Sequence, residues 1–210
     1  MNMLVKVSRL QFYIASFMII GFALIGKQFI IIWAGEQYIN SYYIALVIMV
    51  PQIFSIVQTL FSTMLEAMNK HKVKSLIYLG VALINLILTL ILVKFLGLIG
   101  CALGTAVGML INALLNNLYY KYILNLDMKY YWKQISGMVI PMIAIMIVGM
   151  FISLIIDLNS YVDILLFIVT FTIAYFVMSW KFIFNKYEKS LINSILYKFN
   201  IKKSQIKEIL

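Results

Sequence analysis

The chain has 210 residues, of which 64% are hydrophobic and only 11% are charged. This composition leaves too little polar surface to cover a water-soluble globule, so we expect lipid to be the solvent. Lys and Arg number 17 against 7 Asp and Glu. This excess does not indicate a nucleic-acid partner, because the basic residues are divided among loops rather than gathered on one polar domain.

Six apolar stretches are each long enough to cross a bilayer, whose hydrocarbon core of about 30 Å needs roughly 20 helical residues. The predicted fold class is therefore all-α, a polytopic membrane bundle of six transmembrane helices. Residues 1–187 form this six-helix region, and residues 188–210 form a Lys-rich tail. The predicted spans are Leu10–Trp33, Ser41–Leu65, Ser75–Val93, Leu98–Tyr120, Ser136–Ile156 and Val162–Phe184.

The distribution of charge predicts the orientation of these spans. Apart from Lys27 and Lys94, every Lys and Arg precedes the first span, lies at or beyond the end of the last, or lies in the second or fourth connection. The positive-inside rule then places both termini in the cytoplasm, which an even number of spans allows. We expect a multi-pass protein of the cell inner (cytoplasmic) membrane, in contact with membrane lipids.

The tail has two interpretations. Its apolar residues recur at helical spacing with lysines between and after them, as in an amphipathic helix on the anionic cytoplasmic leaflet. A solvated, frayed tail is the other interpretation. The apolar residues in question are Leu191, Ile192, Ile195, Leu196 and Phe199.

Glycines recur every four residues in the fourth span, at Gly100, Gly104 and Gly108. This spacing places them along one stripe and predicts a helix-packing surface that another backbone can approach closely. Pro51 lies inside the second span and is expected to kink it, because proline removes one helical hydrogen bond.

The chain shows no machinery for catalysis, and we expect no cofactor and no metal site. The carboxylates near the predicted spans lie in loops or at span ends, the glycines form no phosphate-binding loop, and no zinc motif is present. The single cysteine, Cys101, excludes an internal disulfide. We therefore predict that the protein is not an enzyme.

What remains at membrane depth is a set of uncharged amides. Burying an amide in hydrocarbon is costly, so these side chains should face other helices or a wet cavity. Neutral donors and acceptors suit sugars and other uncharged polar cargo, and they also suit simple bonding between helices. The candidate substrate-binding residues are Gln52, Gln58, Asn85, Asn112 and Asn116.

Three segments together resemble the polysaccharide flippase branch of the multidrug/oligosaccharidyl-lipid/polysaccharide exporter superfamily. The segment 25–38 is similar to that family's helix end and outer turn, and 65–72 to its short basic inner loop. The segment 85–105 resembles an Asn-Leu helix followed by a Gly-x-x-Gly turn. The resemblance extends over about Lys6 to Tyr120, and the last two spans match in hydropathy only.

This resemblance implies the C-terminal part of a 14-helix, two-lobed flippase. Such a transporter moves undecaprenyl-diphosphate-linked oligosaccharide to the outer leaflet by alternating access, for export of surface polysaccharide such as O-antigen or exopolysaccharide. The missing N-terminal half would be a partner, and we expect this chain alone to transport nothing. A fragment, the second half of a split gene and an inactive remnant all remain open.

Three alternatives stand beside the flippase. The first is a multidrug or lipid II exporter of the same superfamily. The second is a membrane-embedded glycan polymerase or acyltransferase, which would need a larger outer loop than the sequence supplies. The third is a non-transporting structural subunit whose glycine stripe is an oligomer interface.

Overall fold

The computed structural model describes residues 1–156 and 160–194. This part of the chain is helical without strands, which confirms the all-α prediction at that level. A further helical run, 186–194, follows the last named helix. The named elements are α1 (Asn2–Ala34), η1 (Glu36–Tyr38), α2 (Ile39–Val57), α3 (Thr59–Ala67), α4 (His71–Tyr122), α5 (Met128–Ser136), α6 (Val139–Ile155) and α7 (Tyr161–Phe182).

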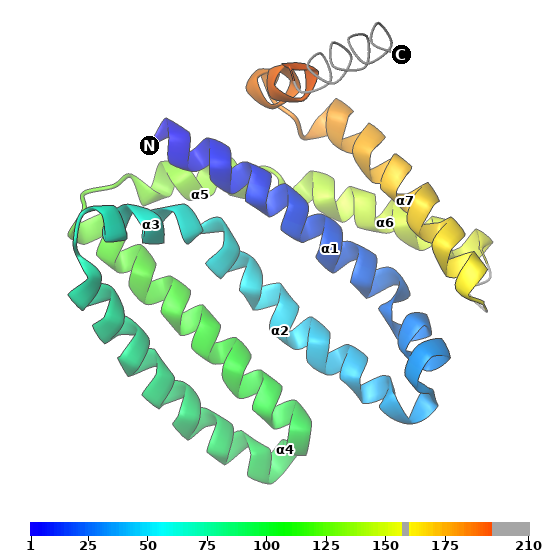
Figure 1. Ribbon diagram of the computed structural model, residues 1–210, viewed down its shortest axis with the longest axis horizontal. Helices are drawn as coiled ribbons and strands as arrows, with labels where there is room; N and C mark the ends of the chain where they lie inside the picture. Colours follow the sequence, from blue (N-terminus) through cyan, green and yellow to red (C-terminus); the bar gives the residue numbers. More distant parts are fainter. Residues whose placement is uncertain (157–159, 195–210) are drawn as a thin grey trace, which may run out of the picture.

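Within the described residues, five helices are long and apolar enough to cross a membrane, as expected of a multi-pass membrane protein. The longest, α4, has 52 residues and would extend about 78 Å if it were straight, more than twice the hydrocarbon thickness. It is not straight. At Gly97 the backbone takes φ 57° and ψ −135°, and the chain reverses so that 71–96 and 98–122 run side by side (Figure 1).

Gly97 allows this reversal because it has no Cβ. A positive φ with this ψ is open to glycine and is strongly disfavoured for any other residue. We call 71–96 the first half of α4 and 98–122 its second half. The reversal falls within the connection predicted between the third and fourth spans.

Helix α1 lies at the centre of the bundle. It packs against α2 on one side and against α6 and α7 on the other, and α4 packs against α2 at the far edge (Figure 1). Aromatic rings fill the contact between α1 and α7. Phe17 stacks on Phe171 with ring centroids 5.9 Å apart, and Tyr13 contacts Tyr175 at 5.0 Å.

One end of the bundle collects the start of α1, α3, both ends of α4, α5 and the end of α7 (Figure 1). We call it the basic end, since lysines of the inner connections lie there. Its core contains Phe61 of α3, whose ring stacks on Tyr120 of α4 at 4.9 Å and meets Tyr131 of α5 edge-on at 4.8 Å. Phe61 and Tyr131 are fully buried.

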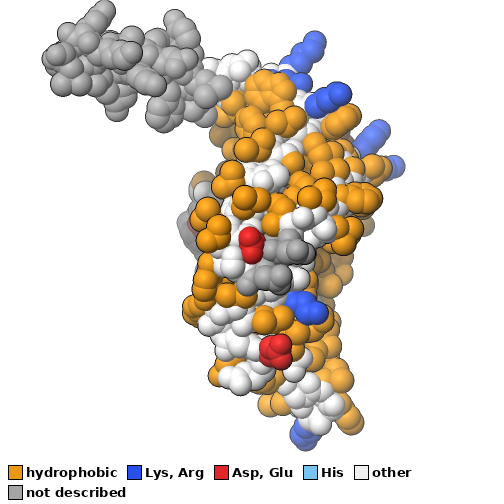
Figure 2. Space-filling model, turned by 90° about the vertical axis from the view of Figure 1, so that its right-hand side faces the viewer, with side chains coloured by type: hydrophobic (Ala, Val, Ile, Leu, Met, Phe, Trp, Pro, Cys, Tyr) orange, Lys and Arg blue, Asp and Glu red, His pale blue; other side chains and the backbone are white. Residues whose placement is uncertain are grey.

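Much of the outer surface is apolar, as a lipid solvent requires. Figure 2 shows one face on which hydrophobic side chains cover most of the described surface. Phe95 and Ile155 are 80% and 82% exposed. Exposure of this extent would cost a soluble protein its solubility, whereas in a bilayer it is the ordinary state of an outward-facing residue.

Helix limits differ from the predicted spans in three places. α1 begins at Asn2 rather than Leu10, so Arg9 lies inside the helix. The second predicted span is interrupted at Gln58, and the helix runs unbroken through Pro51. The connection before the fifth span contains α5, a short helix that begins where the Asp127 carboxylate accepts a hydrogen bond from Tyr130 N at 2.9 Å.

The start of the last helix follows a standard capping pattern. Ser160 Oγ accepts from the backbone N–H of Asp163, and the Asp163 carboxylate accepts from Ser160 N at 3.0 Å. Each side chain thus satisfies a backbone donor that the first turn of the helix leaves open. Of the predicted amphipathic tail, 188–194 are described and helical. Its remaining part, 195–210, lies outside the described residues.

Candidate functional site

The break between α2 and α3 forms the first wall of the site. Phe61 N donates to Gln58 O at 3.1 Å, in place of the carbonyl one residue earlier. The Val57 carbonyl instead accepts two side-chain hydroxyls, Ser8 Oγ at 2.6 Å and Tyr131 Oη at 2.8 Å. All three residues are fully buried. A buried carbonyl released from its helix needs such partners, so α1 and α5 hold the break in place.

Next to this break lies a polar cavity of about 250 Å³. Its lining comes from α2, the start of α3 and both halves of α4. Four of the five candidate substrate-binding residues line it, namely Gln52, Gln58, Asn112 and Asn116. Two segments far apart in sequence, the α2–α3 stretch and the second half of α4, therefore bring together amides that the sequence could only propose one by one.

Hydroxyl and aromatic groups complete the lining. Ser55, Thr59 and Ser62 follow one another along the α2–α3 wall, and Tyr78 and Tyr120 stand at the two ends of α4. No residue that lines the cavity carries a charge. The nearby Lys74 makes an ion pair with Glu66 and lies 5.7 Å from the Tyr78 ring.

The amides of the cavity differ in how well they are satisfied. Asn116 Nδ2 donates to Asn112 O at 2.9 Å and to Asn112 Oδ1 at 3.0 Å, so these two side chains hold each other. Gln58 is only 5% exposed, and its Nε2 has no hydrogen-bond partner among the described residues. A buried N–H without an acceptor is costly, so this amide weakens the fold at the break between α2 and α3.

Asn85 is the candidate that does not line the cavity. It lies on the first half of α4, where its Oδ1 accepts from Thr89 Oγ1 at 3.0 Å. It also faces Gly108 across the hairpin, since a Cβ at that glycine would stand 3.1 Å from Asn85 Cβ. In this structure Asn85 belongs to the hairpin contact.

The predicted glycine stripe lies on the second half of α4 and faces its first half. A Cβ at Gly100 would collide with the Leu92 carbonyl, and one at Gly104 would collide with Thr89. The close approach that the spacing predicts thus occurs within one hairpin.

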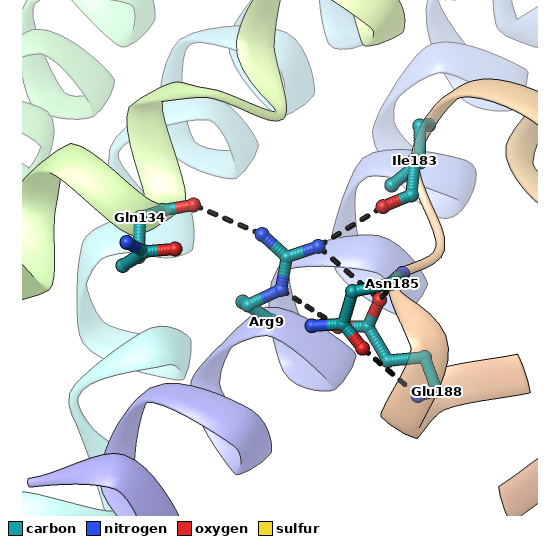
Figure 3. A network of polar contacts seen from close by, with 5 residues as sticks. All are labelled: Arg9, Gln134, Ile183, Asn185 and Glu188. Carbon is teal, nitrogen blue, oxygen red and sulfur yellow. Dashed lines mark hydrogen bonds and ion pairs between the residues drawn. The ribbon is translucent and has the colours of Figure 1, made fainter. Parts of the chain in front are cut away.

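A second polar cluster lies at the basic end, and the sequence analysis missed it (Figure 3). Arg9 Nε donates to Glu188 Oε1 at 2.7 Å, and Nη2 donates to Glu188 Oε2 at 3.2 Å. The same guanidinium reaches Gln134 O at 3.1 Å and Ile183 O at 3.0 Å. Asn185 N also donates to Glu188 Oε2, at 2.7 Å.

Arg9 and Glu188 are each only 9% exposed. The cluster joins α1, α5, the end of α7 and the helical run 186–194. It is a structural tie rather than a binding site, because the Arg9 donors are directed at groups of the chain itself. The one available signal was a Glu at the start of a tail rich in lysine.

In comparisons with known proteins, no family model, no curated protein and no solved structure matches this chain.

Proposed function

We propose that this chain forms the C-terminal part of a membrane transporter that flips undecaprenyl-diphosphate-linked oligosaccharide across the cytoplasmic membrane by alternating access. The proposal rests on the resemblance of 6–120 to polysaccharide flippases and on the cavity at the basic end. The cavity is the main structural support for the proposal. Four amides and three hydroxyls converge there without a charged group, as recognition of an uncharged polyol requires.

The reversal of α4 supports the topology of this proposal. If each half of α4 crosses the bilayer, the chain makes six crossings and both termini lie on one side. The basic end is then cytoplasmic by the positive-inside rule, and the cavity lies nearer the cytoplasm, where lipid-linked sugars are built. Alternating access would require the bundle to rock against a second lobe, which this chain does not supply.

The absence of a charged residue from the cavity lining favours a sugar over a cationic drug as cargo. A drug exporter needs apolar and acidic lining groups for its cargo, and the lining is neither predominantly apolar nor acidic. The diphosphate of the carrier would lie outside the cavity, since a dianion without a cationic partner pays a large desolvation cost.

Photo-crosslinking of the purified chain in nanodiscs tests the proposal. A photoreactive residue replaces Ser62 in the cavity, and a control replaces Leu165, which is 64% exposed on α7. We expect an undecaprenyl-diphosphate oligosaccharide with a fluorescent sugar to crosslink at Ser62. Excess undecaprenyl phosphate, which lacks sugar, should not compete there but should compete at Leu165.

Two results would contradict the proposal. One is no crosslink at Ser62 at saturating lipid. The other is equal competition by undecaprenyl phosphate at both positions, which would show recognition of the lipid alone.

A further inference from the structure

A narrow apolar groove lies at the basic end, between the start of α1 and the helical run 186–194. It is separate from the amide-lined cavity, because the two have no lining residue in common. Its volume is about 80 Å³, which is far less than a turn of helix about 10 Å across occupies but sufficient for a stretch of hydrocarbon chain. It opens at the surface, since Leu10 and Tyr187 on its two walls are each 43% exposed.

The ion pair of Arg9 with Glu188 holds the two walls of the groove together (Figure 3). Glu188 lies at the groove, but its carboxylate accepts hydrogen bonds from the Arg9 guanidinium and from Asn185 N. The charge of Glu188 is therefore balanced within the chain. Because this tie fixes both walls in advance, a ligand loses less entropy on entering the groove.

Lys6 supplies the free positive charge of the groove. Its Nζ lies 3.8 Å from the centroid of the Tyr187 ring, and the side chain is exposed. No carboxylate of the described residues forms an ion pair with it. A contact with an aromatic ring holds an ammonium in place without neutralising it, so the rim presents a positioned cation to an anionic group.

The groove is cationic at one end and apolar at the other. On α1, Leu10 follows Lys6 by one helical turn, which places it about 6 Å further along the helix toward the apolar span. Val7, Leu191 and Ile192 extend the apolar lining. A phospholipid has the same order, because its phosphate lies at headgroup depth and its chains run from there into the hydrocarbon.

The charge around the groove favours an anionic phospholipid over a zwitterionic one. Lys186 and Lys189 lie on the same helical run as Tyr187, and Lys189 Nζ is 5.9 Å from the centroid of the Trp180 ring. Tryptophan prefers headgroup depth, and lysines at that depth attract anionic lipids. A zwitterionic lipid would bring its own cation next to these lysines, and a free anion would gain nothing from the apolar walls.

We infer that the groove binds one anionic phospholipid, with its phosphate at Lys6 and the upper part of one acyl chain between Leu10 and Leu191. In the proposed orientation this lipid belongs to the cytoplasmic leaflet. It bridges α1 and the run 186–194, so the lipid composition of the membrane adjusts how firmly the run is attached to the bundle. The site requires neither the amide-lined cavity nor a flippase activity.

Photo-crosslinking to tagged lipids tests this inference. A photoreactive residue replaces Leu10 in the purified full chain, and a control replaces Leu165, which is 64% exposed on α7 and does not line the groove. The nanodiscs contain phosphatidylglycerol and phosphatidylcholine with the same acyl chains in equal amounts, and one of the two carries the tag in each sample. Placing the photoreactive residue at Ile192, on the opposite wall, repeats the test if replacing Leu10 disturbs the groove.

Phosphatidylglycerol should crosslink at position 10 about five times as much as phosphatidylcholine, as expected for one lysine close to an anionic lipid. The two lipids should crosslink equally at position 165. Soluble glycerol 3-phosphate carries the anionic group without the chains, and it should not compete at position 10.

Substitution of Lys6 separates the groove from the general basic charge of the protein. Lys6→Gln should bring the ratio of the two lipids at position 10 to about one, because it removes the cation and leaves the apolar walls intact. Lys6→Arg keeps the charge and should keep the preference. Lys72→Gln is the matched control, because Lys72 is an exposed lysine of the basic end that does not line the groove, and it should leave the ratio unchanged.

Any of four results overturns the inference. Equal crosslinking of the two lipids at position 10 would show no selection of the anionic headgroup. A preference that survives Lys6→Gln, or that falls equally in Lys72→Gln, would show attraction by the overall charge. Competition by glycerol 3-phosphate would show an anion site that needs no lipid. None of these outcomes bears on crosslinking of the lipid-linked oligosaccharide at position 62, so the proposed function fails or stands separately.

Discussion

Arg9 and Glu188 lie 179 positions apart in the chain and form a buried ion pair, with 2.7 Å between Nε and Oε1. The pair fastens the segment after α7 to the first helix, and Gln134 O and Ile183 O occupy further guanidinium donors (Figure 3). Removing one member of a buried pair leaves the other charge uncompensated, which costs more than the pair itself contributes.

Arg9→Met is therefore expected to destabilise the bundle by about 3–5 kcal/mol, measured by SDS-induced unfolding in mixed micelles. Lys6→Met is the matched control, because Lys6 loses only a contact with the Tyr187 ring, 3.8 Å from the centroid, worth about 0.5–1 kcal/mol at an exposed site. Equal losses of unfolding free energy in the two variants would show that the buried Arg9–Glu188 pair stabilises the bundle no more than the exposed Lys6 contact does.

The Val57 carbonyl provides a double-mutant cycle. Ser8→Ala or Tyr131→Phe alone leaves the carbonyl one partner and should cost about 1 kcal/mol, whereas both together leave it buried and unpaired. We expect the double variant to lose about 1–2 kcal/mol more than the sum of the single ones. Tyr42→Phe, which removes a bond to Ala23 O, is the control for loss of one tyrosine hydroxyl. If the stability losses of the two single variants simply add up in the double variant, Ser8 and Tyr131 do not act on the same carbonyl.

The hairpin of α4 depends on glycine at two positions for different reasons. Gly97→Ala should cost about 1–3 kcal/mol, because its φ and ψ are strained for any other residue. Gly104→Ala should also destabilise, because its Cβ would meet the Thr89 backbone at 2.9 Å. Gly80→Ala, with nothing within 4 Å, should be neutral or stabilise by up to about 1 kcal/mol. The free energies of unfolding of the three variants are measured side by side. If Gly80→Ala loses as much stability as Gly104→Ala, close packing at Gly104 does not explain the loss.

Residue Asn85 separates hairpin contact from cargo binding. Asn85→Ala should lower stability by about 0.5–1.5 kcal/mol through loss of its bond with Thr89, and leave crosslinking of the lipid-linked oligosaccharide at position 62 unchanged. Asn116→Ala is the companion variant, because it removes an amide from the cavity wall, and it should weaken that crosslinking. Weaker crosslinking in the Asn85 variant would show that Asn85 belongs to the binding site after all.

The periodic and compositional parts of the fold could be predicted from the sequence. Long apolar runs set the helices, and four of the five proposed amides share one cavity because membrane-depth amides must avoid lipid. Asn85 obeys the same rule and satisfies it within the hairpin instead. Hydropathy alone cannot choose between these two outcomes, since both remove the amide from lipid.

Other features depend on tertiary contacts that no local pattern encodes. The break at Gln58 depends on hydroxyls from Ser8 and Tyr131, which lie on two other helices. Helix α5 was missed because its lysines and aromatic residues fit an interfacial loop equally well. The partners Arg9 and Glu188 lie at opposite ends of the chain, so only the folded bundle brings them together.

We propose that α4 crosses the membrane twice and that the basic end, with its cavity, faces the cytoplasm. Single cysteines at Lys72, Lys94 and Lys129 in a Cys101→Ala background test it, by labelling with an impermeant maleimide on intact and permeabilised cells. The account predicts that Lys94→Cys is labelled in intact cells, whereas Lys72→Cys and Lys129→Cys are labelled only after permeabilisation. Labelling of Lys72→Cys and Lys129→Cys from opposite faces would contradict it.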